Sequence, residues 1–169
     1  PYGISKLTWE YYLNYYQRAF AIPSVWLRYA NVYGPRQRAD GEAGVIAIFI
    51  HHLLDGRSPK INGDGKQTRD YVYIGDVVAA NLLALESPYT GALNIGTGNE
   101  TDVLSLFELL RKKMGLQVAA VHGAAKTGEQ RRSSLDSSRA REKLGWSPRT
   151  TLGQGLGKTI EYYRRSNIE

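Results

Sequence analysis

Apolar residues recur at helical spacing in several stretches of the chain. The first stretch has apolar side chains at positions 4, 7, 11, 12, 15 and 16, which predicts a helix over residues 5–16. The same reading predicts helices over 45–54, 77–86, 101–114, 137–144 and 156–164. We expect Gly75-Asp76 to cap the third helix and the Thr101 hydroxyl to cap the fourth, and Gly115 and Gly145 to end the fourth and fifth.

Short apolar runs between these helices predict strands. They lie at residues 25–27, 59–61, 71–74, 93–95 and 118–121. Glycine and polar residues predict a turn at 62–65 and loops at 36–43 and 126–134. Because strands and helices alternate, the sequence predicts an α/β fold with a parallel pair of strands in its first part.

Composition narrows the class of protein. The 169 residues are 42% hydrophobic, which predicts a folded domain, and the net charge of +6 suits an anionic ligand. Lys112-Lys113 and Arg131-Arg132 are interpreted as exposed charge, and without interleaved aromatics they do not predict nucleic-acid binding. The absence of cysteine excludes disulfides and thiol chemistry and favours the cytoplasm. No membrane segment, signal peptide or metal site is predicted.

Tyr2 and Lys6 are the first residues that could carry chemistry. They are four positions apart and so share one face of the first helix. A lysine ammonium held beside a tyrosine stabilises the phenolate, the form that can act as a general base. The alternative is a chance pair in a tyrosine-rich helix.

Three further polar segments are candidate ligand sites. Asn31 follows a predicted strand and could present its amide to a ligand, or could simply form a turn. Arg69 could grip a phosphate with two donors, or could pair with its neighbour Asp70 at the surface. Lys126 and Glu129 flank Gly128 and could meet a phosphate and a ribose, or could belong to a solvated loop.

Taken together and in this order, the segments are similar to the extended short-chain dehydrogenase/reductase family of nucleotide-sugar enzymes. The similar segments are Tyr2-Gly3-Ile4-Ser5-Lys6, residues 28–37, residues 63–72, residues 94–98, Gly128-Glu129, residues 144–148 and Gly155-Leu156. Within the family, residues 41–46 and Arg69-Asp70-Tyr71 most resemble UDP-glucose (UDP-galactose) 4-epimerases rather than UDP-glucuronate decarboxylases.

The resemblance implies a catalytic pair and NAD as cofactor. Tyr2 would remove the proton of the sugar 4-hydroxyl while hydride passes from C4 to NAD+, and Lys6 would bind the nicotinamide ribose. Tyr29 would contact the nicotinamide region.

The resemblance also implies a set of substrate-binding residues. Asn31 would meet the diphosphate or sugar, Arg69 and Lys126 a phosphate, and Glu129 the uridine ribose. The backbone of Gly44-Val45 would meet the nucleotide sugar, and Ile61-Asn62 would line the uracil pocket. Two positions depart from the family pattern, because Lys126 replaces a usual arginine and Asn62 a frequent aromatic residue.

The glycine-rich dinucleotide fingerprint of the family is not in the sequence. We therefore expect residues 1–43 to be the last helix and strand of an incomplete NAD-binding Rossmann domain. Residues 44–169 are expected to form mainly a smaller mixed α/β substrate-binding lobe, with segments that return to the Rossmann domain.

The function expected for the whole protein is C4 epimerisation of a UDP-sugar, and this chain alone is expected to be inactive. The alternatives are another nucleotide-sugar dehydratase or decarboxylase, or a non-catalytic nucleotide-sugar binding module. The resemblance also implies a homodimer or other self-association through the Tyr2 helix.

Overall fold

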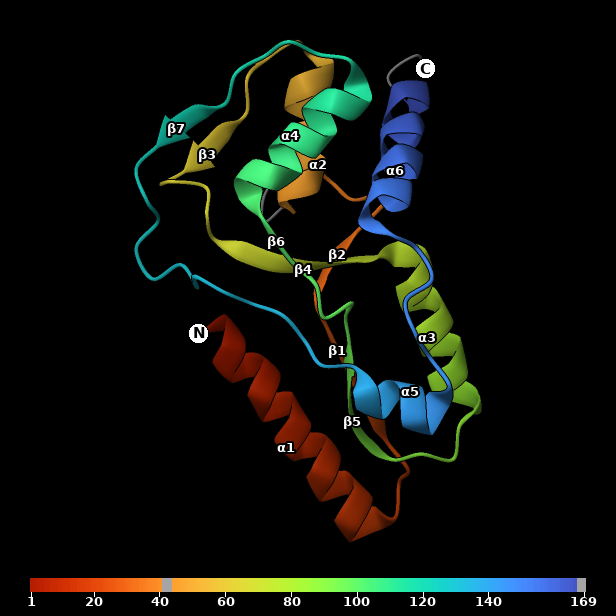
Figure 1. Cartoon of the computed structure of the whole chain (residues 1–169). Coiled ribbons are helices and arrows are strands. Elements are labelled where there is room, and N and C mark those ends of the chain that lie inside the picture. The colour runs from red at the N-terminus through yellow and green to blue at the C-terminus, as the bar shows by residue number, and fades with distance from the viewer. Residues whose placement is uncertain (41–43, 167–169) are drawn as a thin grey trace.

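A computed structural model describes residues 1–40 and 44–166 (Figure 1). Its helices are α1 (Tyr2–Phe20), α2 (Val45–Leu54), α3 (Ile74–Glu86), α4 (Val103–Met114), α5 (Ser138–Leu144) and α6 (Leu152–Ser166). Its strands are β1 (Val25–Tyr29), β2 (Asn31–Tyr33), β3 (Lys60–Asn62), β4 (Thr68–Tyr73), β5 (Gly91–Ile95), β6 (Glu100–Asp102) and β7 (Val121–Gly123).

The strands form three small sheets. β1 pairs in parallel with β5, from Val25 opposite Gly91 to Tyr29 opposite Ile95. β4 lies between β2, which is parallel to it, and β6, which is antiparallel. β3 pairs in parallel with β7. The predicted α/β class with parallel strands is confirmed.

Two hydrophobic clusters hold these elements together. The larger one lies among α2, α4 and α6, which gather at one end of the molecule in Figure 1. Its buried side chains include Phe49 and Ile50 of α2 and Leu106 and Leu110 of α4, spaced as the apolar pattern predicts. The smaller cluster lies among β1, β5, α3 and α5 and contains the buried Trp146.

Several expectations about element boundaries were wrong. α1 and α3 each begin three residues earlier than predicted, and β7 begins at Val121, where the predicted strand ends. The strands β2 and β6 were not predicted, and Thr101 lies in β6 rather than at a helix cap. Asp102 caps α4 instead, because its carboxylate accepts the Ser105 N–H at 2.8 Å. Asp76 lies inside the first turn of α3, and it accepts the Thr150 N–H at 3.0 Å. α6 begins at Leu152, four residues earlier than predicted.

Asp70 joins two separate loops to β4. The residue is 1% exposed. Its carboxylate accepts the backbone N–H groups of Thr97, Gly98 and Leu135 at 3.0–3.2 Å, and also the Thr97 hydroxyl. The surface pair between Arg69 and Asp70, considered above as an alternative, is therefore wrong.

Replacing Asp70 by alanine is expected to lower the free energy of unfolding by about 2–4 kcal/mol, because the three backbone N–H groups would lose their acceptor inside the protein. Urea denaturation of this chain measures the change. Asp40→Ala is the matched control, since Asp40 forms an exposed ion pair with Arg38. If Asp70→Ala lowered the free energy of unfolding no more than Asp40→Ala does, the role of Asp70 in joining the two loops to β4 would be contradicted.

Candidate functional site

The first helix brings Tyr2 and Lys6 to one edge of the β1–β5 sheet. The Gln17 amide donates to the Thr90 hydroxyl at 3.0 Å, at the start of β5, whereas Glu10 binds Arg28 near the end of β1. α1 therefore runs antiparallel to β1, and Tyr2 lies about two turns beyond Glu10. This places Tyr2 towards the carboxyl ends of β1 and β5, the edge where α/β folds bind ligands.

Tyr2 and Lys6 lie together on the exposed surface of α1. The Lys6 Nζ is 5.3 Å from the centroid of the Tyr2 ring, and Tyr2 is 71% exposed. The Ser5 hydroxyl donates to the backbone carbonyl of Tyr2 at 2.8 Å. An exposed phenol beside an ammonium can exchange a proton with a molecule bound at this edge.

Tyr29 and Asn31 follow at the same edge. The Tyr29 hydroxyl donates to Asn81 Oδ1 at 2.9 Å, and the Tyr29 side chain is partly exposed. Asn31 opens β2 and lies opposite Tyr71 of β4, so the alternative that it forms a turn is wrong. Within residues 1–40 and 44–166 its side-chain amide has no hydrogen-bond partner, which leaves it available to a ligand. The neighbouring Arg28 forms an ion pair with Glu10 of α1.

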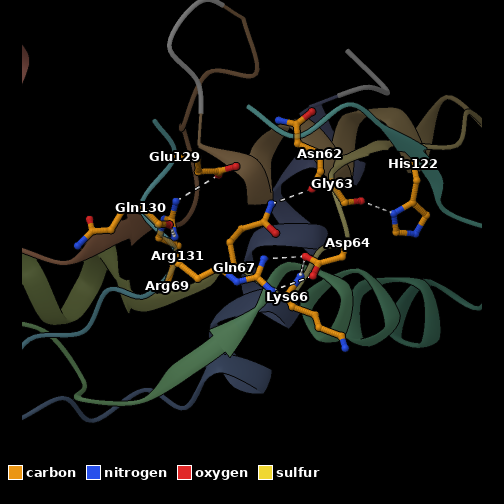
Figure 2. A network of polar contacts seen from close by, with 10 residues as sticks. All are labelled: Asn62, Gly63, Asp64, Lys66, Gln67, Arg69, His122, Glu129, Gln130 and Arg131. Atoms are coloured by element: carbon orange, nitrogen blue, oxygen red, sulfur yellow. Dashed lines mark hydrogen bonds and ion pairs between the residues drawn. The ribbon is translucent and has the colours of Figure 1, made fainter. Parts of the chain in front are cut away.

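A second polar site is a cavity of about 250 Å³ beside the β3–β7 pair (Figure 2). Asn62, Gln67, Lys126, Glu129 and Arg131 are among the residues that line it. The pairing of β3 with β7 brings the chain that follows residue 123 close to the end of β3. Three candidates that are far apart in the sequence, Asn62, Lys126 and Glu129, thus meet in one cavity.

Arg69 reaches this cavity through Glu129. Its Nη2 donates to Glu129 Oε1 at 3.2 Å, and its Nη1 donates to the carbonyls of Thr68 and Gln130 at 2.7 Å. Both side chains of the ion pair are largely buried, at 18% and 26% exposed. A guanidinium has five N–H donors, so among the described residues the Nε–H and one Nη2–H of Arg69 have no acceptor and are available to an anion.

Arg131, which was interpreted as exposed charge, forms a wall of the cavity. It donates two hydrogen bonds of 2.8 Å to the carboxylate of Asp64. The Arg131 guanidinium, aided by the N–H of Lys66, holds the pKa of the Asp64 carboxyl well below its usual range. Both partners are therefore charged at neutral pH, and they tie the loop after β7 to the turn after β3.

The other candidates do not line this cavity. The Ile61 side chain is fully buried in the larger hydrophobic cluster, so only its backbone can meet a ligand. Gly44 is the N-cap of α2 and Val45 its first residue, where unpaired N–H groups can bind an anion. A Cβ on Gly44 would lie 2.6 Å from the Gln37 Nε2. Residues 41–43, which supported the epimerase resemblance, lie outside the described part of the chain.

Gln67 is, with Arg131, one of the cavity residues that the sequence did not single out as a site residue. Its only signal was its place between Gly65 and Arg69, in a segment already singled out. Across the described residues, no group of three or more metal-binding side chains is arranged to hold an ion. Each helix there is also too short or too polar to cross a lipid bilayer.

Comparison with known proteins finds a family whose model matches this chain. Residues 1–96 match the model of the NAD dependent epimerase/dehydratase family. The chain is 43% identical over 169 residues to the UDP-glucose 4-epimerase of Mycolicibacterium smegmatis, covering 99% of this chain and 54% of that protein. The chain spans about half the length of the curated relatives it matches.

Solved structures agree with the family match. A UDP-glucose 4-epimerase of Thermotoga maritima, solved with UDP-glucose, has a TM-score of 0.97 and 48% identity, over 100% of this chain and 54% of that one. A UDP-glucose 4-epimerase of Thermus thermophilus, solved with NAD, has a TM-score of 0.89 and 36% identity, over 97% of this chain and 54% of that one.

Proposed function

Because the chain belongs to the NAD-dependent epimerase/dehydratase family, we propose that it supplies the general base and the substrate cavity of a UDP-glucose (UDP-galactose) 4-epimerase. The observation that carries this proposal is the cavity that unites Asn62, Lys126 and Glu129, with Arg69 fixed to Glu129. Similarity to UDP-glucose 4-epimerases of three organisms supports it.

The cavity has the charges that a nucleoside diphosphate requires. The free donors of Arg69 and the ammonium of Lys126 bind phosphate oxygens, and Glu129 accepts hydrogen bonds from ribose hydroxyls. Lys126 acts as a point charge, because an ammonium lacks the two-pronged donor geometry of a guanidinium. The uracil ring lies beside Asn62 and the backbone of Ile61.

Tyr2 accepts the proton of the sugar 4-hydroxyl in this proposal. NAD+, when bound, supplies the acceptor for the hydride that leaves C4. The residues at the carboxyl edge fit its nicotinamide end: Lys6 can donate to the ribose hydroxyls, and the partly exposed Tyr29 ring can contact the nicotinamide. Asn31 and the α2 terminus at Gly44-Val45 contact the substrate sugar and diphosphate.

The proposed division of the chain places residues 1–43 in an NAD-binding lobe and residues 44–169 mainly in a substrate lobe. Two separate hydrophobic clusters support this division. The cluster around β1 also contains residues of β5, α3 and α5, which would be the later segments that return to the NAD-binding lobe. Residue 43 itself lies outside the described part. We further propose a homodimer or other self-association through α1, whose exposed residues include Trp9 and Tyr12. A cytoplasmic location is proposed from the absence of cysteine.

Two alternatives belong to different classes. A nucleotide-sugar dehydratase or decarboxylase would share the cavity and the tyrosine but lose water or carbon dioxide from the sugar. A non-catalytic binding module would bind a UDP-sugar and leave it unchanged. Because the dinucleotide fingerprint is not in this sequence, we expect the chain alone to bind a UDP-sugar without turning it over.

Product analysis separates these functions. By the complete enzyme we mean this chain joined to the part of the Thermotoga maritima epimerase that it does not cover. Incubated with UDP-galactose, the complete enzyme is expected to form UDP-glucose, resolved by chromatography. A dehydrated or decarboxylated product would support the first alternative, and recovery of unchanged substrate would support the second.

A further inference from the structure

Gln67 is the buried polar side chain of the nucleotide cavity. The residue is 6% exposed, whereas Asn62, Lys126 and Arg131 are exposed. It lies between the turn after β3 and the start of β4. Figure 2 shows its amide between the Arg69–Glu129 pair and the Asn62–Gly63 backbone. The deepest polar group of the cavity is therefore a neutral amide.

A single hydrogen bond fixes the orientation of this amide. Gln67 Nε2 donates to the backbone carbonyl of Asn62 at 3.1 Å. Because a carbonyl only accepts, the NH₂ group must face Asn62 and the oxygen Oε1 must face the other way. The oxygen and nitrogen of a glutamine amide are ordinarily hard to tell apart, and here the Asn62 carbonyl decides between the two orientations.

The Gln67 oxygen is left without a partner in the described residues. It is also not sealed from solvent. The side-chain atoms in the described part that are both sealed and unpartnered belong to Trp26, Gln37, His52 and Tyr71. An accessible, oriented acceptor at the bottom of a cavity is suited to a ligand that carries an N–H or O–H donor.

The distribution of charge indicates which part of a nucleotide meets Gln67. The ionic groups Lys126, Glu129 and Arg131 also line the cavity and are less buried than Gln67, and their charges suit a diphosphate and a ribose. The neutral base is the part that belongs at a neutral, buried amide. We propose that Gln67 Oε1 accepts the imide N–H of a uracil- or thymine-type base and so determines base specificity. This inference rests on the proposed function, since it requires a nucleotide in the cavity.

The same geometry disfavours cytosine. At the position where uracil and thymine carry an N–H donor, cytosine carries an acceptor, which would face the Gln67 oxygen. Turning the amide over would present its NH₂ to cytosine but would break the bond to the Asn62 carbonyl. Either arrangement leaves a polar group unpaired at a buried position, which lowers affinity.

Calorimetric titration of the 169-residue chain with three probes tests the proposal. The probes are UDP, CDP and N3-methyl-UDP, which lacks the imide proton. The chain is expected to bind UDP about three- to tenfold more tightly than either of the other two. Gln67→Met is expected to lose that preference because only its affinity for UDP falls. Gln117→Met, at an exposed glutamine away from the cavity, is expected to keep it.

Each contrary outcome identifies what failed. Equal affinity of the unmodified chain for UDP and N3-methyl-UDP would overturn the proposal, whether or not Gln67→Met folds. An equal loss for all three nucleotides in Gln67→Met, together with weaker binding of inorganic pyrophosphate, would assign Gln67 to supporting the turn and would also overturn it. No binding of UDP by the unmodified chain would instead overturn the proposed nucleotide site, and the inference with it.

Discussion

Replacing Tyr2 by phenylalanine is expected to lower the turnover of the complete enzyme by about 100- to 10,000-fold, because it removes the hydroxyl that we propose takes the substrate proton. The ring keeps its place near the Lys6 ammonium, 5.3 Å from its centroid, so cofactor binding is expected to persist. Steady-state kinetics with UDP-galactose and spectroscopic measurement of bound NAD check both expectations.

Tyr11→Phe is the matched control for this change. Tyr11 is an exposed tyrosine of the same helix, and its hydroxyl is outside the proposed site. Removing the Tyr11 hydroxyl is expected to leave the turnover of the complete enzyme unchanged. Normal turnover of Tyr2→Phe, or equal losses in both variants, would remove Tyr2 from the role of base.

The second large effect is expected at Arg69. Arg69→Ala removes the donors that we propose bind phosphate and also frees Glu129, whose carboxylate accepts from Arg69 at 3.2 Å. The affinity for UDP-glucose is therefore expected to fall by about 10- to 100-fold, as for the loss of a charged hydrogen-bonding group. Titration calorimetry of this chain measures the loss.

Arg69→Lys and Arg132→Ala sharpen this test. Lysine retains the positive charge but not the two-pronged donor geometry. The affinity of Arg69→Lys for UDP-glucose is therefore expected to lie between those of the wild type and Arg69→Ala. Arg132 lies in the same loop as Glu129, is exposed and pairs with Glu100 of β6, and its removal is expected to change the affinity for UDP-glucose little. Unchanged UDP-glucose affinity in Arg69→Ala would contradict the phosphate role.

Helices were predictable from the sequence because apolar side chains recur along most of them at helical spacing, and α2 and α4 bury that apolar stripe. α2 was predicted over its full length, since Ile46, Phe49, Ile50 and Leu53 all face the core. β2 and β6 were not, because three residues are too few to show an alternating pattern. The cap of α4 was misplaced by one residue, since Thr101 and Asp102 are both good capping residues.

The site was predictable only in part. Single residues such as Lys126 and Glu129 carried little signal alone, and it was the resemblance that identified them. Their meeting with Asn62 depends on the pairing of β3 with β7, which no periodicity reveals. The roles of Gln67 and Asp70 were missed because they depend on burial and on hydrogen bonds between distant segments.

Isotope tracing in the complete enzyme tests the central claim most directly. UDP-galactose that carries deuterium at C4 is supplied in ordinary water, and the sugar product is examined by NMR. C4 epimerisation by hydride transfer predicts UDP-glucose with deuterium still at C4, and Tyr2→Phe is expected to form almost none of this product. Exchange of the C4 label for solvent hydrogen, or a product other than the C4 epimer, would contradict the account.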